Sequence, residues 1–144
     1  MRYKIKIHLA KRKDRTGIFN VAEKSLPINY TLDEWGEMIS EKNSFVLEAS
    51  GEIVGYIICN SMACIVSFAI LKEFRGNGYG KLLLHECLDN LKKNKYKKVV
   101  LRVQTNNEIA QKLYVSTGFK IVEKIAGYYK NLDNSDAFLM TLEF

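Results

Sequence analysis

The sequence predicts a single domain of mixed α/β architecture, in which a mixed central sheet carries helices on both faces. Three observations lead to this prediction. Short segments that alternate polar and apolar residues, or are apolar throughout, recur along the chain and are typical of strands. The segments between them carry apolar residues at helical spacing. The chain has 144 residues, the length of one domain, and its 47% hydrophobic and 26% charged residues are usual for a globular protein.

The first half of the chain shows one strand, two helices and three further strands. The first helix must end before Pro27, because a proline disfavours helical geometry in the residue before it. Thr31 and Glu34 form a capping box, which marks the start of the second helix. The turn Ser50-Gly51 predicts a hairpin. The predicted elements are strand 3–9, helix 14–24, helix 31–42, and strands 45–49, 52–59 and 63–71.

The second half predicts an amphipathic helix, a short apolar strand of the kind buried inside a sheet, a second helix that ends at Gly118, and two last strands. These elements are helix 78–93, strand 99–103, helix 107–116, and strands 120–126 and 137–142. The whole order is β-α-α-β-β-β-α-β-α-β-β. A helix joins strands 63–71 and 99–103, so we expect these two strands to be parallel neighbours.

Composition excludes several classes of protein. The three cysteines, Cys59, Cys64 and Cys87, lie in apolar stretches without a Cys-x-x-Cys pair and are expected to be buried thiols. Unpaired thiols of this kind favour the reducing cytoplasm. The two histidines are far apart, so no metal site is expected. The longest apolar run, residues 62–71, is too short to span a bilayer, so no membrane partner is expected. The net charge of +6 is scattered, and no specific nucleic-acid partner is expected.

A glycine-rich turn lies between strand 63–71 and helix 78–93. A helix N-terminus presents unpaired amide groups and a partial positive charge, and glycines let the backbone approach an anion. Flanking cations complete a phosphate site of the kind that binds a pyrophosphate. Taken alone, such a turn is as often structural as functional. Its residues are Arg75, Gly76, Asn77, Gly78, Tyr79, Gly80 and Lys81.

Two blocks of sequence resemble the GNAT acetyltransferases. The pattern Arg75-x-x-Gly78-x-Gly80 is similar to the signature with which that family binds the pyrophosphate of acetyl-CoA. The segment from Val103 to Phe119 is similar to the second half of the family pattern, with an Asn, then Ala, Leu-Tyr and Gly-Phe at the same intervals. The resemblance covers essentially the whole chain, and it implies the GNAT fold over residues 1–144, acetyl-CoA as cofactor and an acyltransferase reaction.

Two further segments resemble those of protein N-terminal acetyltransferases. The loop from Leu26 to Tyr30 is similar to the Leu-Pro-x-x-Tyr segment of these enzymes, and residues 127–140 are similar to their Tyr-Tyr…Asp-Ala ending. The resemblance implies that a protein or peptide N-terminus is the acceptor, with a ribosome or ribosomal protein as a candidate partner. The implied substrate-binding residues are Leu26, Pro27, Ile28, Tyr30, Arg102, Tyr128 and Tyr129. The structural alternatives are that the Tyr pair only caps a core and that Pro27 only ends a helix.

The resemblance also implies the roles of catalytic residues. A backbone amide around Phe68, Ala69 and Ile70 is expected to contact the coenzyme and to stabilise the oxyanion. The hydroxyl of Tyr114 is expected to protonate the leaving thiolate, with a core aromatic as its alternative. Asn107 is expected to contact the coenzyme arm, although a preference for the helix cap also explains it.

The general base is where the chain departs from the family pattern. The positions at which relatives carry a base hold Arg102, Cys64 and Ile28, and an arginine stays protonated. We therefore expect deprotonation through water held by Tyr128 and Ser67. An α-amino group, with a pKa of about 7.7–8.0, needs less help than a lysine ε-amine near 10.4. Ile28 also favours an apolar first residue such as Met.

Three alternatives stay open at the level of sequence. They are a lysine acetyltransferase, an acetyltransferase of polyamines or other small amines, and a non-catalytic CoA-binding or ribosome-associated module of the same fold. The apolar and aromatic acceptor segments count against polyamines, which favour acidic pockets. A monomer and a homodimer are both compatible with the sequence, and so is an auxiliary subunit.

Overall fold

The computed structural model describes residues 3–144 and contains one seven-stranded sheet with helices on both faces. The elements follow the predicted order, with two added single turns of 3-10 helix. They are β1 (Ile5–Leu9), η1 (Arg12–Asp14), α1 (Arg15–Ser25), α2 (Leu32–Met38), β2 (Phe45–Ala49), β3 (Glu52–Cys59), β4 (Cys64–Ile70), η2 (Lys72–Phe74), α3 (Tyr79–Lys93), β5 (Lys98–Gln104), α4 (Glu108–Thr117), β6 (Lys120–Ile125) and β7 (Ala137–Glu143).

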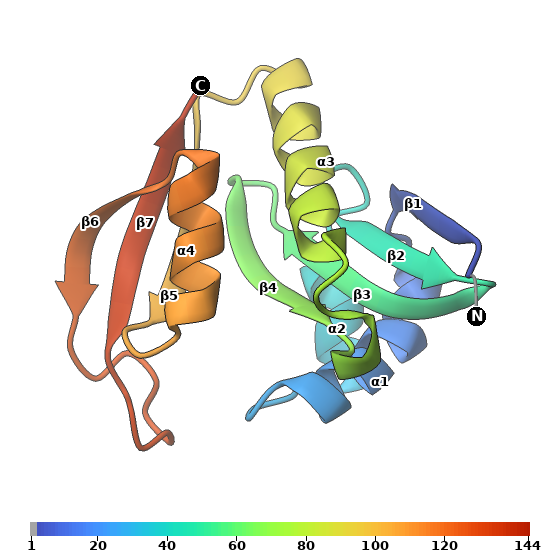
Figure 1. Cartoon of the computed structure of the whole chain (residues 1–144), viewed down its shortest axis with the longest axis horizontal. Coiled ribbons are helices and arrows are strands. Elements are labelled where there is room, and N and C mark those ends of the chain that lie inside the picture. Colours follow the sequence, from blue (N-terminus) through green and yellow to red (C-terminus); the bar gives the residue numbers. More distant parts are fainter. Residues whose placement is uncertain (1–2) are drawn as a thin grey trace.

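The strand order in the sheet is β1-β2-β3-β4-β5-β7-β6. All neighbouring strands are antiparallel except β4 and β5, which are parallel as predicted. Helix α3 joins them. Figure 1 shows β5, β6 and β7 on one side of the molecule and β1 to β4 on the other. The parallel pair is therefore the seam between two halves of the sheet.

The seam between β4 and β5 is short. Only two residue pairs are in register, Cys64 with Val100 and Ile65 with Leu101. The strands part immediately after these pairs, at a bulge in β4: Ile65 lies opposite Cys59 of β3 and Ser67 lies opposite Ile58, so Val66 is an extra residue. A bulge bends its strand and increases the local twist. Beyond Ile65 the two strands diverge, as Figure 1 shows.

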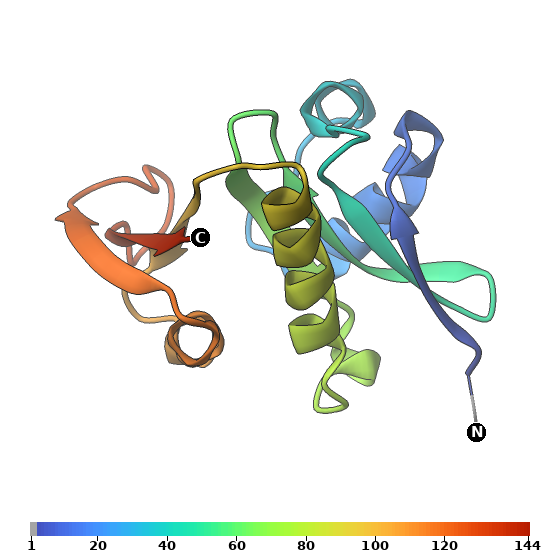
Figure 2. The same ribbon diagram turned by 90° about the horizontal axis from the view of Figure 1, so that it is seen from above.

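Two apolar clusters fill the two faces of the sheet. Helices α3 and α4 cover one face, where Leu83, Leu84 and Leu91 of α3 are fully buried. Helices α1 and α2 cover the other face, with Ile18 and Trp35 fully buried. Figure 2 shows the sheet between the two pairs of helices. The two faces of β4 and β5 therefore pack against different pairs of helices.

The second helix is shorter than predicted. It ends at Met38 rather than at Lys42, and residues 41–43 form a turn. Asn43 is buried, and its side-chain amide donates to the carbonyl of Asn60 and to the hydroxyl of Tyr96. These hydrogen bonds hold residue 43 outside the helix. Their partners are far away in sequence, so the helical spacing of apolar residues could not predict where α2 ends. The predicted capping box at Thr31 and Glu34 is present.

Two of the three cysteines are buried, as expected, and all three are free thiols. The expectation is wrong for Cys64, which is only half-buried. Its side chain lies at the seam where β4 parts from β5, beside Arg102. In residues 3–144 there is no helix with the length and apolar character needed to cross a membrane.

Replacing Leu83 by alanine should lower the free energy of unfolding by about 2–5 kcal/mol, because it leaves a cavity in the core. The neighbouring Leu82 is 52% exposed, and Leu82→Ala should change this free energy by less than about 0.5 kcal/mol. Urea unfolding of both variants measures the difference. Equal losses would contradict the packing of α3 against the sheet.

Candidate active site

A cavity of about 250 Å³ occupies the space between the diverging strands β4 and β5. Its walls come from both faces of the sheet. The residues that line it are Leu26, Pro27, Ile28, Tyr30, Ile65, Val66, Ser67, Phe68, Leu101, Arg102, Val103, Gln104, Asn107, Ala110, Tyr114, Tyr129 and Leu132. The cavity therefore connects the α3/α4 side of the sheet with the α1/α2 side.

On the α3/α4 side, Tyr114 and Phe68 form the wall. Tyr114 is buried in the core, and its ring lies 6.4 Å from that of Phe68 and 5.7 Å from that of Phe119. Burial raises the pKa of the Tyr114 hydroxyl, so it stays protonated at neutral pH. Asn107 caps α4 as predicted, because its Oδ1 accepts from the amide of Ala110 at 3.2 Å. This side presents a protonated phenol and the start of a helix.

On the α1/α2 side, the loop between α1 and α2 brings Leu26, Pro27, Ile28 and Tyr30 to the cavity. Asn29 anchors this loop. Its Oδ1 accepts from the backbone amide of Tyr30 at 2.8 Å and from Nε1 of Trp35 at 2.9 Å. Its Nδ2 donates to the carbonyl of Phe19 and to the carboxylate of Glu23. The loop is held by one partly buried polar cluster, while Ile28 and Tyr30 remain partly exposed.

The loop of residues 126–136, between β6 and β7, carries Tyr128 and Tyr129. Both residues lie outside any strand, with their ring centres 4.9 Å apart in an edge-to-face contact. Burial raises the pKa of Tyr129 to about 12, with a smaller contribution from Tyr128. Tyr129 lines the cavity, and Tyr128 packs on it without lining the cavity itself. The loop therefore adds a neutral hydroxyl to the site.

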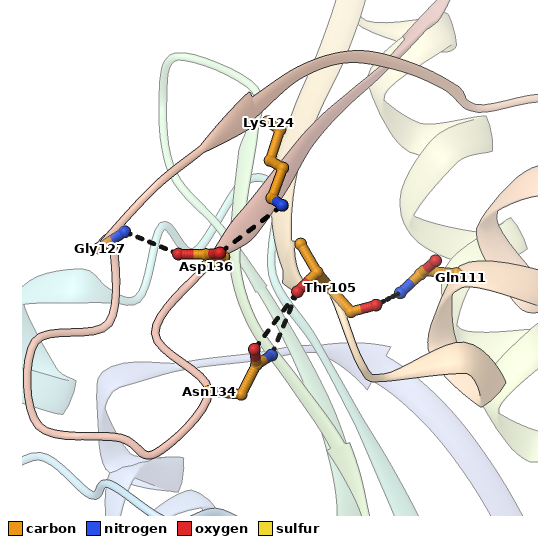
Figure 3. Close-up of polar contacts among 6 residues, drawn as sticks. All are labelled: Thr105, Gln111, Lys124, Gly127, Asn134 and Asp136. Atoms are coloured by element: carbon orange, nitrogen blue, oxygen red, sulfur yellow. Dashed lines mark hydrogen bonds and ion pairs between the residues drawn. The ribbon is translucent and has the colours of Figure 1, made fainter.

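Figure 3 shows how polar contacts hold both ends of this loop. The carboxylate of Asp136 accepts from the amide of Gly127 at 3.0 Å and lies 3.7 Å from Nζ of Lys124. The side chains of Asn134 and Thr105 form a hydrogen bond, which ties the loop to the end of β5. The carbonyl of Thr105 also accepts from Nε2 of Gln111 in α4 at 3.0 Å.

Arg102 projects from β5 on the α1/α2 side of the sheet. Its Nη1 lies 3.6 Å from Sγ of Cys64, and its guanidinium carbon lies 5.6 Å from the centre of the Tyr128 ring. Burial raises the pKa of the Cys64 thiol despite the nearby guanidinium, which lowers it. Cys64 is thus a protonated thiol at neutral pH.

Ser67 is the polar residue of β4 in the cavity wall. Its hydroxyl and that of Tyr56 are 2.8 Å apart and share a hydrogen bond. Tyr56 is fully buried, and burial raises the pKa of its hydroxyl. The buried Tyr56 thereby fixes the orientation of Ser67 at the cavity.

The glycine-rich turn has the geometry expected of an anion site. Gly76 and Gly78 both have φ of +79°, a left-handed conformation that favours glycine. Gly78 is the N-cap of α3 and provides no side chain to satisfy the first amides of the helix. Nε of Arg75 donates to the carbonyl of Ile70 at 2.8 Å, which fixes the turn to the end of β4.

The turn does not line the cavity but adjoins it. A Cβ placed on Gly80 would lie 3.7 Å from Cζ of Phe68, which is in the cavity wall. A ligand that binds both places would therefore run from the start of α3, past Phe68, into the gap between the strands. Within the described part of the chain, no group of three or more His, Cys, Asp or Glu side chains is placed to hold a metal ion.

The structure brings most of the predicted site residues together. The predicted residues that line the cavity are Leu26, Pro27, Ile28, Tyr30, Ser67, Phe68, Arg102, Asn107, Tyr114 and Tyr129. Those outside it are Ala69, Ile70, Tyr128 and the turn from Arg75 to Lys81.

Sequence reasoning missed several residues of the site. The alternation of β5 places Val103 on the α3/α4 face and Gln104 on the opposite face, and this pattern was available in the sequence. Nothing in the sequence marked Leu132, Asn29 or Tyr56, whose roles depend on contacts between distant segments.

Comparison with known proteins agrees with this geometry. Residues 11–119 match the model of the Acetyltransferase (GNAT) family. An N-alpha-acetyltransferase of Sulfurisphaera tokodaii is 31% identical over 153 aligned positions, which cover 94% of this chain and 90% of the relative. A [ribosomal protein bS18]-alanine N-acetyltransferase of Haemophilus ducreyi is 33% identical over 95 positions, 62% of this chain and 66% of the relative.

Among solved structures, Arabidopsis thaliana Naa50 in complex with the bisubstrate analogue CoA-Ac-MVNAL is 26% identical and superposes with a TM-score of 0.87. The match covers 97% of this chain and 99% of that one. The two-sided cavity, the turn before α3 and these matches lead to one conclusion: the chain belongs to the acetyltransferase (GNAT) family and is an acetyl-CoA-dependent N-acetyltransferase.

Proposed function

We propose that this enzyme acetylates the α-amino group of protein N-termini by direct attack of the amine on acetyl-CoA within a ternary complex. The observation that carries the proposal is the cavity between β4 and β5, whose walls come from both faces of the sheet. A donor bound along α3 and α4 and an acceptor bound between the two loops would meet there. Holding two reactants in this way can lower a barrier by about 7–11 kcal/mol.

The turn from Arg75 to Lys81 is proposed to bind the pyrophosphate of the coenzyme. The first amides of α3, together with the cations of Arg75 and Lys81, favour a phosphate at this helix start. Asn107 and Tyr114 are proposed to flank the coenzyme arm where it enters the cavity.

The backbone of β4 supplies a candidate oxyanion donor. The amide of Leu71 donates to the carbonyl of Val54 in β3, at 2.8 Å. Amides alternate in direction along a strand, so those of Phe68 and Ile70 point away from β3, toward the gap where β5 has diverged. The Phe68 amide is therefore proposed to stabilise the oxyanion that forms when the thioester is attacked.

The proposed reaction forms the amide C–N bond and breaks the thioester C–S bond, and a proton passes to the sulfur to give CoA. The Tyr114 hydroxyl is the proposed donor to that sulfur. Its raised pKa keeps it protonated, which favours donation of a hydrogen bond to the leaving thiolate. Ser67 and Tyr128 are proposed to hold the water that takes the proton from the amine, Ser67 from the cavity wall.

The acceptor amine has to arrive neutral, because the cavity offers no base of suitable pKa. Among the described residues of its lining there is neither a carboxylate nor an imidazole. The pKa of Tyr129 is raised to about 12, and Arg102 cannot accept a proton. An α-amino group with a pKa of about 7.7–8.0 is partly neutral at pH 7, whereas a lysine side chain near 10.4 is not.

The acceptor side also favours a peptide. Leu26, Pro27 and Ile28 offer an apolar wall for the first side chain, such as that of Met, and Tyr30, Tyr128 and Tyr129 are proposed to hydrogen-bond the peptide backbone. The relative from Haemophilus ducreyi is named for a ribosomal protein, and a nascent or ribosomal N-terminus in the cytoplasm is the proposed partner of this chain.

The test of the function uses matched acceptors. Peptides that begin Met-Leu, Ser-Ser or Ala with a free α-amine and no lysine should be acetylated. The same peptides with a blocked α-amine and one internal lysine should react at least about tenfold more slowly, since the ε-amine is far less often neutral. Mass spectrometry locates the added acetyl group. Exclusive modification of lysine, or of polyamines, would overturn the proposal.

The pH dependence gives a second measurement of the same function. For the Met-Leu peptide, kcat/KM should rise with pH and level off above about pH 8, where the α-amine becomes neutral. Because burial raises the pKa of Tyr114 and takes that of Tyr129 to about 12, no fall is expected below pH 10. A rise that continues to pH 10 would contradict the proposal that ionisation of the α-amine sets the rate.

Replacing Gly78 by alanine should weaken CoA binding about tenfold or more. Alanine disfavours the left-handed conformation at the start of α3, and without it the amides of the turn lose their charge-assisted hydrogen bonds to the phosphates. Gly51→Ala is the matched control. Gly51 also has positive φ (+90°), and like Gly78 it has open space where a Cβ would lie. Both variants should lose about 1–2 kcal/mol of stability. Equal CoA affinities by calorimetry would contradict the assignment of the turn.

Tyr114→Phe should lower kcat by about 10²-fold, because it removes the donor to the leaving sulfur. The affinity for acetyl-CoA should change less than about threefold, since the ring and its packing remain. Single-turnover rates and coenzyme titrations separate the two effects. An unchanged kcat would leave Tyr114 as a packing residue only.

A further inference from the structure

We propose that Arg102 selects acceptors whose second residue is acidic, so that the preferred N-termini carry an apolar first residue followed by Asp or Glu. The inference rests on the proposed N-terminal acetyltransferase function and assigns a substrate class to the acceptor side of the same cavity. At the position where relatives carry a general base, this chain would thus use Arg102 to bind the substrate.

The surroundings of Arg102 orient its guanidinium without neutralising it. Its contacts include the protonated thiol of Cys64, 3.6 Å away, and the ring of Tyr128, 5.6 Å away, and its charge also acts on the neutral Tyr129 hydroxyl. A cation over an exposed ring gains only about 0.5–1 kcal/mol. None of the ion pairs formed by residues 3–144 includes Arg102. The guanidinium therefore retains donors for a ligand.

Arg102 is also the one charged side chain among the described residues that line the cavity. The polar groups beside it, such as the hydroxyls of Ser67 and Tyr129, are neutral near pH 7. A cation in a partly enclosed, otherwise uncharged wall attracts an anion and disfavours a second cation. The planar fork of a guanidinium matches a carboxylate in particular.

The position of Arg102 across the cavity assigns the carboxylate to the second residue. The apolar wall of Leu26, Pro27 and Ile28 belongs to a loop on the β4 side, since Leu26 packs on the cluster that contains Ala69, and the first side chain is proposed to bind there. Successive side chains of an extended peptide point to opposite sides. When the first side chain faces that loop, the second faces the β5 side, where Arg102 lies with Tyr128.

If Arg102 had a structural role, its replacement would lower the free energy of unfolding, and the contacts of Arg102 argue against this. Its side chain is exposed, and its contacts are one weak hydrogen bond and one ring, so its removal should leave stability within about 0.5 kcal/mol. Lys98 provides a matched control. It is exposed on the same strand and four residues away, which separates the two Cα atoms by about 13 Å.

The experiment compares kcat/KM for three peptides that differ only at the second residue, Met-Asp, Met-Asn and Met-Lys, with a common lysine-free tail. The wild-type enzyme should prefer Met-Asp over Met-Asn about tenfold and should disfavour Met-Lys. Arg102→Gln should bring the Asp/Asn ratio to about one. Lys98→Gln should keep the ratio, and Arg102→Lys should keep only part of it, because the charge remains but the planar fork is lost. Raising the salt concentration should reduce the wild-type ratio.

The outcomes separate this inference from the function on which it rests. A wild-type Asp/Asn ratio near one, or a ratio that survives Arg102→Gln, overturns the role of Arg102 while N-terminal acetylation stands. A ratio that Lys98→Gln abolishes equally would make the effect one of net charge and overturns it as well. Failure of all three peptides, with lysine side chains or polyamines acetylated instead, overturns the proposed function and this inference together.

Discussion

The site depends on the early end of the pairing between β4 and β5. Only two residue pairs join these strands, and the bulge at Val66 turns β4 away just after them. Backbone groups on the facing edges then lack strand partners, and buried backbone groups are seldom left without any. Water or a ligand has to satisfy them. The gap therefore removes strand pairing, and the unpaired backbone groups along it can form hydrogen bonds with an extended ligand.

The two sides of the gap are connected through Thr105. Its carbonyl accepts from Gln111 of α4, which lies on the side assigned to the donor. Its hydroxyl bonds to Asn134, which holds the loop of Tyr128 and Tyr129 on the side assigned to the acceptor. Figure 3 shows both contacts meeting at the end of β5. A shift of that strand end would move α4 and the loop of residues 126–136 together.

Local patterns predicted most of the fold, and contacts between distant segments account for what they missed. The period of α3, the capping box at Thr31 and the cap at Asn107 involve residues close in sequence, and the structure contains all three. The early end of α2 depends on Asn43 and its partners Asn60 and Tyr96, which no periodicity reveals.

The features of the candidate site divide in the same way, into signals that are local in sequence and contacts that form only between distant segments. The glycine turn is a local signal, and Gly76 and Gly78 have the positive φ that glycine tolerates. The anchors of the two loops are not local. Asn29 and Tyr56 looked like ordinary loop or strand residues, and their importance follows from hydrogen bonds that only the folded chain forms. Asp136 was marked by the family resemblance, but its contact with Gly127 was not.

The ionisation state of the cavity is nearly constant over the physiological range of pH. Burial raises the pKa of Tyr114 and takes that of Tyr129 to about 12, so both hydroxyls stay neutral well above pH 7. Arg102 stays charged throughout. A wall built from neutral hydroxyls and one permanent cation offers the same field at pH 6 and at pH 9. With the proposed α-amine acceptor, we therefore expect changes in rate across this range to follow the ionisation of the acceptor.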